Sequence, residues 1–424
     1  MSHTAAPPRR EARAPAAALA AVAGGVAAAL HIGKLPPALP ALQASLDIGL
    51  VQAGFLLSLV QVAGMCFGIV IGLAADRIGL RRSMLIGLSV ITLASLLGGG
   101  VGYLVEDHAS AIRWLLALRG LEGAGFLLAV MPGPGLVRAM SPQGSEKAML
   151  GLWGAYMPLG VALALLLGPA LIARAGWPGW WWALAAASAA AAAWVALAVP
   201  GDSARAPARS QAAPEAWSRR LGETVRASAP WTLALSFAVY SSQWLAVIGF
   251  LPAIYAEAGV PGGWSAAFTA LAAAMNIAGN VVAGRLLQRG VAPVTLLRWG
   301  FVVMALCSVA AYARLGDAPN ALGLPPALRY LAICLFSLVG GFVPATLFML
   351  GVRLAPRPSA VSTTVGLMQQ ASAFGQFVAP PVVAWLAHRV GGWQWTWVVT
   401  VAASLAGLAL AARLSPTMRR LGVA

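Results

Sequence analysis

Charged residues are scarce in this chain of 424 residues. They make up 9% of it, whereas ordinary soluble domains carry about 25%. Hydrophobic residues make up 60%, and the mean hydropathy is +0.81. Lipid requires every backbone polar group to be bonded within the protein, and a helix bundle meets that requirement. The shortage of charge therefore excludes an ordinary soluble domain and predicts an all-α membrane protein.

Cysteine and histidine are also rare, which limits the chemistry that the chain can perform. The three cysteines, Cys66, Cys307 and Cys334, lie inside apolar runs without paired spacing, so we expect buried thiols and no disulfide. The four histidines lie far apart and make no metal-ligand spacing. No nucleophile motif stands out. We therefore expect neither a metal, nor another cofactor, nor an enzyme.

Acidic residues are too few to balance the basic ones, which leaves a net charge of +16. Nucleic acid is not an expected partner, because the basic residues lie in short loops between apolar runs and not on one soluble face. Loops rich in arginine and lysine stay in the cytoplasm. With the N-terminus inside, the predicted outer loops hold few basic residues: Lys34, Arg113, Arg174, Arg314, Arg329 and Arg389. This bias predicts that both termini lie in the cytoplasm. We expect a bacterial inner-membrane protein surrounded by lipid.

Twelve apolar runs are long enough to cross the hydrocarbon core as helices of ~20 residues, although the last of each half is borderline. They cover residues 16–32, 50–75, 83–105, 111–137, 149–173, 180–199, 231–256, 266–287, 294–314, 328–352, 362–387 and 395–412. Composition then divides the chain into a tail (1–14), a first six-helix bundle (15–199), a cytoplasmic linker (200–230), a second bundle (231–412) and a second tail (413–424). A signal peptide is the alternative for the first run. The stretch Gly33-Lys34-Leu35-Pro36 recurs in similar form later in the chain, which argues against a signal peptide.

The two halves repeat at a nearly constant spacing, which indicates two homologous bundles. The stretch from Gly33 to Pro36 corresponds to Gly249-Phe-Leu251-Pro252. Five further residues of the first half have identical partners in the second: Arg138, Gly151, Gly160, Trp180 and Trp182 correspond to Arg353, Gly366, Gly375, Trp395 and Trp397.

A short polar turn joins the second and third runs. It reads Gly72-Leu-Ala-Ala-Asp76-Arg77-Ile-Gly79-Leu-Arg81-Arg82. Its glycines allow close approach and positive φ, and its charged side chains can bind helix ends. The alternative is an ordinary basic loop. We interpret Gly72, Asp76, Arg77, Gly79, Arg81 and Arg82 as a conformational latch that binds the inner ends of neighbouring helices, with Glu146 as one candidate partner.

This turn resembles the signature loop between helices 2 and 3 of the major facilitator superfamily. Arg119-Gly-Leu-Glu122-Gly-Ala-Gly125 resembles the fourth-helix motif of the same superfamily. Lys34-Leu-Pro-Pro37 and Gly366-Leu-Met-Gln369-Gln370 are similar to elements of the cyanate and nitroimidazole permeases. The resemblance implies two pseudo-symmetric bundles of six transmembrane helices, a mid-membrane substrate site between them, and access that alternates as one bundle rocks on the other.

Charges inside lipid spans are candidates for function, because they are costly there. Arg119 and Glu122 lie one helical turn apart and share a face. We expect Glu122 to take up the coupling proton, while Arg119 favours its ionised form and binds the charge of the substrate. The alternative is a purely structural ion pair. Lys34 is predicted to face the cavity and bind an anionic substrate, because Pro36 and Pro37 disturb the helix beside it. The alternative for Lys34 is a side chain that snorkels to the outer surface.

Histidine 31 and several uncharged groups complete the candidates. His31 can titrate near neutral pH and is assigned to proton coupling, with a packing role as the alternative. In the second half we assign four residues to substrate binding: Tyr240, Gln243, Asn276 and Gln369. Amides in lipid also bind helices together, which is the alternative for these. The tryptophans near 177–182 are predicted to form an interfacial belt.

The sequence therefore predicts a secondary transporter, expected as a monomer, that couples uptake of a small organic or inorganic anion to protons. The anion follows from the two intramembrane cations, Lys34 and Arg119, which outnumber one carboxylate. The alternative is a proton-driven exporter of hydrophobic, drug-like compounds, because Gly160 with Gly168-Pro169 resembles part of the fifth-helix motif of drug/proton antiporters. A membrane sensor lacks support in the sequence.

Overall fold

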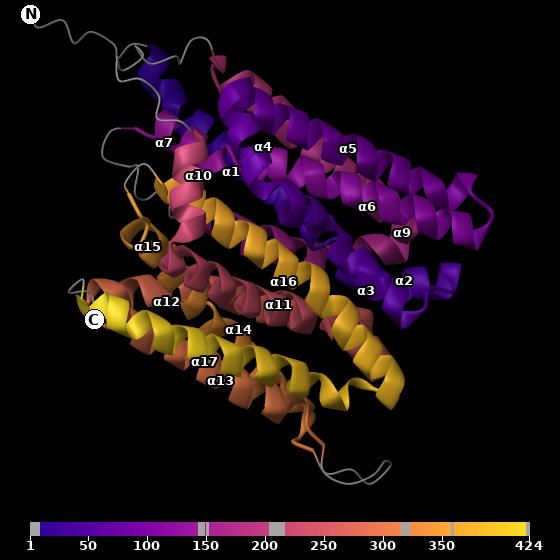
Figure 1. The fold of residues 1–424 in the computed structure, drawn as a ribbon. Coiled ribbons are helices and arrows are strands. Elements are labelled where there is room, and N and C mark those ends of the chain that lie inside the picture. The colour runs from indigo at the N-terminus through magenta and orange to yellow at the C-terminus, as the bar shows by residue number, and fades with distance from the viewer. Residues whose placement is uncertain are drawn as a thin grey trace, which may run out of the picture.

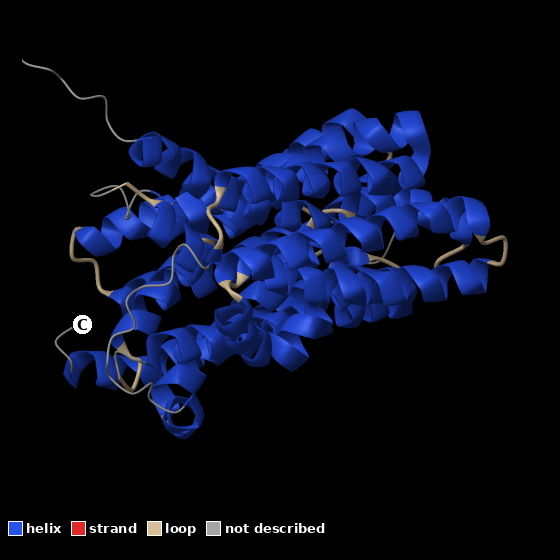
Figure 2. Cartoon of the chain, turned by 90° about the horizontal axis from the view of Figure 1, so that it is seen from above, coloured by secondary structure: helices blue, strands red, loops and turns tan. Residues whose placement is uncertain are grey.

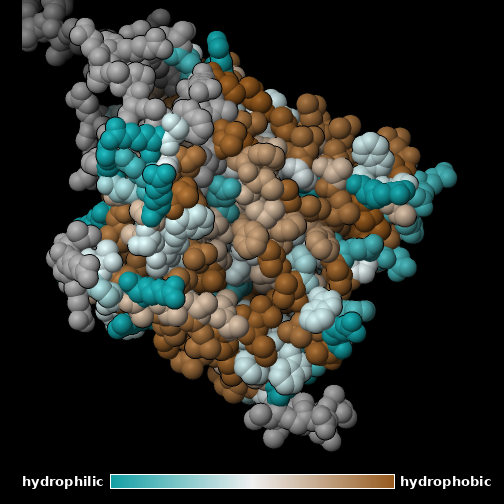
Figure 3. Space-filling view, viewed as in Figure 1, coloured by the Kyte–Doolittle hydropathy of each residue, from teal (hydrophilic) through white to brown (hydrophobic). Residues whose placement is uncertain are grey.

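The computed structural model describes residues 9–142, 149, 152–202, 217–314, 323–357 and 360–420; the side chains of a few helical residues, among them 72–77, lie outside this description. All regular structure in these residues is helical (Figure 2). The helices form two groups that lie side by side along a common direction (Figure 1). Apolar side chains cover the middle of the surface, and polar ones gather toward its ends (Figure 3). This distribution is that of an integral membrane protein.

The first lobe contains the helices of the first half of the chain. In order they are α1 (Arg9–Ile32), α2 (Leu35–Leu46), α3 (Leu50–Ser58), the 3₁₀ turn η1 (Leu59–Gln61), α4 (Val62–Ile78), α5 (Leu80–Leu104), α6 (His108–Val130), α7 (Gly133–Met140) and α9 (Tyr156–Ala198). The long helix α9 is two spans in one, because its backbone kinks at Gly176, where φ is 67°. Asp107 begins α6 by accepting a hydrogen bond from the backbone N–H of Ser110.

The second lobe follows the linker helix α10 (Trp217–Arg226). It contains α11 (Ser228–Glu257), α12 (Gly262–Gln288), α13 (Pro293–Tyr312), α14 (Pro326–Gly340), α15 (Phe342–Arg353), α16 (Val361–Val390), η4 (Trp393–Trp395) and α17 (Thr396–Arg420). Figure 1 places α10 at the end of the molecule where α17 ends. An ion pair from Arg357 to Glu223 ties α10 to the segment before α16.

Ten stretches of the described residues are long and apolar enough to span a membrane. One of them, Tyr156–Ala198, holds two spans across its kink, and α16 adds another helix of 30 residues. The fold is therefore consistent with the twelve predicted spans. The first span differs from the predicted run 16–32, because the chain continues from Ile32 through a turn into α2 and extends to Leu46. Lys34 consequently lies within the membrane span. Its predicted place among the basic residues of the outer loops is therefore wrong.

Equivalent glycines show the relation between the two lobes. Gly160 of α9 packs against α1, where an added Cβ would lie 2.7 Å from the carbonyl oxygen of Val26. Its sequence counterpart, Gly375 of α16, packs in the same way against the carbonyl of Ala238 in α11. The repeat therefore preserves a packing contact that only a residue without a side chain permits.

The lobes touch each other mainly where α3, η1 and α4 pack against α16, with further contacts of α2 on α11 and α9 on α12. Gly54 and Gly64 allow the first of these contacts, because an added Cβ would meet Pro381 at 3.0 Å and Ala373 at 2.8 Å. Gln61 donates a hydrogen bond across the boundary to Gln376 (Nε2 to Oε1, 3.1 Å). In this structure the two lobes are closed on each other along α16.

Candidate functional site: a buried charge cluster at the break of the first span

The break between α1 and α2 leaves backbone carbonyls without helical partners. Proline has no N–H, so Pro36 cannot bond to the carbonyl of Ile32, four residues earlier. Arg119 of α6 supplies the missing donors: its Nη1 lies 2.5 Å from the oxygen of His31 and its Nη2 lies 3.4 Å from that of Ile32. A third donor, Nε, bonds to the carbonyl of Leu56 in α3 at 3.3 Å. Arg119 thus joins three helices at a helix C-terminus, where positive charge is favoured.

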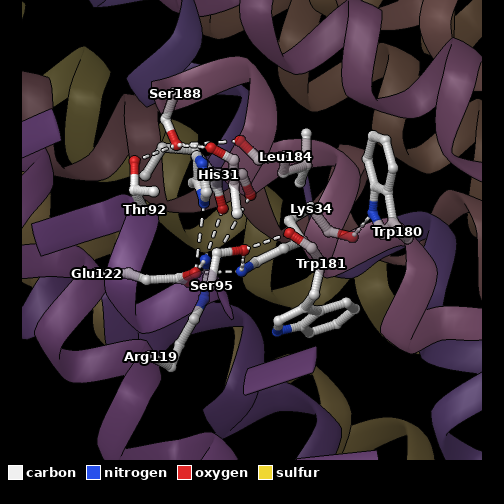
Figure 4. A network of polar contacts seen from close by, with 12 residues as sticks. His31, Lys34, Thr92, Ser95, Arg119, Glu122, Trp180, Trp181, Leu184 and Ser188 are labelled. Atoms are coloured by element: carbon white, nitrogen blue, oxygen red, sulfur yellow. Dashed lines mark hydrogen bonds and ion pairs between the residues drawn. The ribbon is translucent and has the colours of Figure 1, made fainter. Parts of the chain in front are cut away.

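Glu122 is the acceptor on which the cluster converges (Figure 4). Its Oε2 accepts from Nη1 of Arg119 at 2.8 Å. Its Oε1 accepts from Nζ of Lys34 and lies 3.3 Å from Nδ1 of His31. The side chains of all four residues are at most 3% exposed. The four first-half residues that the sequence assigned to proton coupling and anion binding therefore meet at one place, near the middle of the first and fourth spans.

Lys34 is enclosed on every side. Its Nζ donates to Oγ of Ser95 at 3.1 Å and lies 4.6 Å from the centre of the Trp181 ring. Trp180 donates from Nε1 to the carbonyl of Lys34 at 3.0 Å. Lys34 itself is 0% exposed. The alternative of a snorkelling lysine is therefore wrong, because the side chain turns inward to Glu122 and not outward along the helix.

Two tryptophans of the predicted interfacial belt belong to this cluster instead. Trp180 and Trp181 are buried, as is Trp177, whereas Trp182 is partly exposed. The belt prediction is therefore wrong for the three buried residues. For Trp180 and Trp181 the partners explain why: the indole N–H of Trp180 and the carbonyl of Trp181 bond to groups of the cluster or to Ser95. Ser95 was not predicted, since one serine in an apolar span gives no signal of its own.

The cluster carries one more positive charge than negative when His31 is neutral. Arg119 and Lys34 contribute two cations, and Glu122 contributes one anion. Nε2 of His31 is buried and has no hydrogen-bond partner among the described residues. A net buried charge is costly unless a counter-charge completes it. The site therefore favours an additional anion or the loss of one proton.

The predicted residues of the second lobe form separate networks. Asn276 donates to the hydroxyl of Tyr240 at 2.8 Å and to the carbonyl of Ser337 at 2.9 Å. Gln243 donates to the carbonyl of Val239 at 2.9 Å and accepts from Ser404 of α17 at 3.0 Å. Gln369 is half-buried. The contacts of Asn276 and Gln243 are those of helix packing within the lobe, and their role in substrate binding stays a prediction.

A chain of amides and hydroxyls crosses the boundary between the lobes. It runs from Gln61 through Gln376 to Ser372 and Ser241. Gln370 extends the same contact by donating to the carbonyl of Met65 at 2.8 Å. The sequence did not single out Gln61, which lies in the 3₁₀ turn that interrupts the second span.

Only part of the predicted latch lies within the description. The surroundings of Gly72, the side chains of Asp76 and Arg77, and the candidate partner Glu146 lie outside the described residues. The backbone N–H groups of Arg81 and Arg82 donate to the two carboxylate oxygens of Asp202 at 3.0 and 3.1 Å. Gly79, with φ of 104°, leaves room for that carboxylate. Asp202, which the sequence did not suggest, therefore caps the start of α5 from the far end of α9.

These features define a class: a membrane bundle of two related lobes in contact, with a buried charge cluster in one of them, has the architecture of an alternating-access transporter. The Major Facilitator Superfamily matches residues 17–380 of the chain. Because this match spans most of the sequence, the protein belongs to the Major Facilitator Superfamily, a family of transporters and not of enzymes.

Relatives agree with this assignment at the level of the family. The multidrug resistance protein Stp of Mycobacterium tuberculosis (strain CDC 1551 / Oshkosh) is 30% identical over 141 residues, which are 33% of this chain and 25% of that protein. An uncharacterized MFS-type transporter of M. tuberculosis (strain ATCC 25618 / H37Rv) is 30% identical over 138 residues, or 32% of this chain and 22% of that one. The chain thus spans about a quarter of the length of the curated relatives it matches.

A solved structure agrees over nearly the whole chain. It is the crystal structure of a bacterial homolog of the human lysosomal transporter Spinster, in an inward-facing and occupied conformation. The TM-score is 0.72, with 98% of both chains covered and 15% identity. At this identity the likeness shows the fold alone. The finer resemblance to cyanate and nitroimidazole permeases stays a prediction.

Proposed function

We propose that the protein is a secondary transporter that takes up a small organic or inorganic anion together with protons, in a bacterial inner membrane with both termini cytoplasmic. The observation that carries the proposal is the single carboxylate of Glu122, which accepts from Lys34 on one oxygen and from Arg119 on the other. The alternating-access architecture of the family supplies the transport step.

Protonation of Glu122 explains how a proton and an anion become coupled. In the ionised state, Glu122 neutralises one of the two buried cations. When Glu122 gains a proton, both cations are left buried without a counter-charge, which is unfavourable. An anion bound beside Lys34 restores the balance. The two ligands therefore favour each other's binding, and this coupling is reciprocal.

Lys34 and Arg119 have different roles in this scheme. Arg119 donates four hydrogen bonds, three to backbone carbonyls and one to Glu122, so its side chain is held in a fixed position. Lys34 has a flexible stem, and among the described residues its Nζ bonds to two side chains, Glu122 and Ser95. We infer that Lys34 moves from Glu122 to the anion, while Arg119 contributes its charge.

Thermal stability reports the binding of a ligand before the transported substrate has been identified. A screen of purified protein against small anions and lipophilic cations should find an anion that raises the melting temperature. A ligand present at 100 times its Kd stabilises the folded state by about 2.7 kcal/mol. The rise should be larger at low pH, because protonated Glu122 binds the anion better. It should vanish in Lys34→Gln and persist in the control Arg113→Gln, which removes an exposed charge. Stabilisation by lipophilic cations alone would overturn the anion proposal.

Transport assays test the role of the carboxylate once such an anion is found. Glu122→Gln holds the side chain in a neutral form, so we expect it to abolish accumulation driven by a proton gradient. Counterflow exchange of the anion should persist, because it needs no net proton movement. Unchanged accumulation in this variant would contradict proton coupling through Glu122.

One observation favours a second function, proton-driven export of hydrophobic compounds. A relative over a third of the chain is named a multidrug resistance protein. The cluster would then couple protons to an exported, drug-like substrate that binds between the lobes. The stability screen separates the two proposals by the charge of the compounds that stabilise the protein.

We also retain the loop of residues 72–82 as a latch, with Asp202 as the partner of its arginines. Asp76→Asn is expected to slow transport while leaving substrate affinity nearly unchanged, since the loop acts on the conformational step.

A further inference from the structure

A small cavity touches the charge cluster. Its volume is about 10 Å³, which is room for about one water molecule. Its polar lining comes from Arg119 and Glu122, and its apolar lining includes Leu42, Leu56, Leu115 and Leu118. These leucines are buried, so the cavity is closed in this structure.

The cavity lies on one side of the cluster. Helix α6 begins at His108, so Leu115 and Leu118 precede Glu122 by one to two turns, toward the 105–107 loop. Leu42 lies beyond Lys34 along α2, toward the 47–49 loop at the same end. The unpartnered Nε2 of His31 belongs to α1, on the other side of the break. The cavity therefore extends from Glu122 toward the loops predicted to face outward.

We propose that this cavity is the proton port of the first lobe. It holds a water molecule that bonds to Arg119 and to Glu122 and delivers protons to the carboxylate. The step transfers one proton from a hydrated proton to an oxygen of Glu122, which yields a neutral carboxyl and a water molecule. This inference rests on the proposed proton coupling and adds the route by which the proton arrives.

Chemistry and size make the port selective. Among the described residues, Arg119 has one N–H left after its four hydrogen bonds, and Oε2 of Glu122 accepts from Arg119 alone, so both can bond to a water. The leucines exclude larger ions, and a narrow apolar constriction opens or closes by wetting and drying. Every lining residue belongs to the first lobe. Glu122 can thus be protonated while the lobes remain closed, along a route separate from that of the substrate.

Changes of cavity volume test the port. Leu118→Phe and Leu42→Phe fill the cavity from two different helices, whereas Leu118→Ala enlarges it. Leu121→Phe is the matched control, because Leu121 lies on the same helix and is 45% exposed on its outer face. The rate of Glu122 protonation is measured by infrared spectroscopy after a pH jump on purified protein in detergent. The carboxyl band is assigned by its loss in Glu122→Gln.

We expect the two filled variants to slow protonation at least tenfold, Leu118→Ala to accelerate it, and Leu121→Phe to leave it unchanged. A loss of folding would not slow protonation when the cavity is filled and accelerate it when the cavity is enlarged. If a folded, monodisperse filled variant and Leu118→Ala both protonate at the wild-type rate, the port is refuted, although proton coupling through Glu122 stands. If no band of Glu122 responds between pH 4 and 9, the proposed proton coupling itself is refuted.

Discussion

Glu122 has an unusual set of neighbours for a carboxylate in lipid, because two cations and a histidine surround it. Each cation enters from a different helix, Lys34 from the break of the first span and Arg119 from the fourth span. Removal of one partner from such a buried pair is far more costly than removal of a surface ion pair. The residue is therefore a structural centre of the first lobe, and we propose it as the group that responds to protons.

Arg119→Lys tests the structural part of this site. Lysine keeps the positive charge beside Glu122 but lacks the planar fork that bonds to the carbonyls of His31, Ile32 and Leu56. We expect the free energy of unfolding, measured by SDS titration in mixed micelles, to fall by about 3 kcal/mol, because carbonyls at the helix break lose their donors. Arg113→Lys, an exposed substitution on the same helix, is the control and should have little effect. Equal stability of Arg119→Lys and wild type would contradict the bracing role of Arg119.

Helices of this protein approach each other through glycines. On α6, Gly125 faces the backbone of α5, and an added Cβ would lie 2.8 Å from the carbonyl oxygen of Gly87 and 3.0 Å from the nitrogen of Ile91. Gly123 on the same helix faces the backbone of Val60 in η1. Small residues let backbones in lipid pack closely, which supplies much of the stability of membrane helices. The fourth-helix motif is therefore a packing motif as well as the source of the charges.

Two substitutions on α6 separate packing from helix propensity. Gly125→Ala should destabilise the protein by about 1–3 kcal/mol, because backbone atoms cannot move aside as a flexible side chain can. A Cβ added at Gly120 would meet no neighbouring atom within 4 Å. Gly120→Ala should therefore leave stability unchanged or raise it, since alanine favours the helix. Melting temperatures of the two purified variants give the comparison. A Gly125→Ala variant as stable as Gly120→Ala would show that α5 and α6 are not held at this distance.

At the scale of the whole molecule, the contact of α16 with α3, η1 and α4 closes one part of the boundary between the lobes. The hydrogen bond from Gln61 to Gln376 must break whenever the lobes separate there. The carbonyl of Met65 also loses its donor, Gln370. Because polar groups in lipid are costly without partners, these bonds favour the closed arrangement until water or substrate replaces them.

Gln61→Ala should therefore shift the lobes toward separation. Loss of one amide bond in a membrane interior corresponds to about 0.6–2 kcal/mol, or a change of about 3- to 30-fold in the equilibrium. The measurement is the maleimide labelling rate of Ala373→Cys, which faces Gly64 across the boundary, in a chain whose three native cysteines are replaced. Gln52→Ala is the control, because Gln52 bonds within its own lobe to the N–H of Gly49. Labelling as slow as in the control would show that the amide pair does not hold the lobes together.

The sequence by itself determined the number of spans, their grouping into related halves and the identity of the intramembrane charges. Long apolar runs have few structural solutions in lipid, and a charge within such a run is visible without any structure. The break before Pro36 followed in the same way, because proline removes a backbone donor whatever its surroundings.

Only the tertiary structure decided which of these residues meet. Lys34 lies at the break of the first span and Glu122 in the fourth span, and no local pattern determines how those two spans rotate toward each other. The same limit applies to Ser95, Gln61 and Asp202, which are ordinary in their own segments and acquire partners only across helix contacts. It also explains the error for Trp180 and Trp181, since an indole beside a predicted interface is equally suited to lipid headgroups and to a buried lysine. Local chemistry follows from the chain itself, whereas the pairing of distant groups depends on the packing of whole helices.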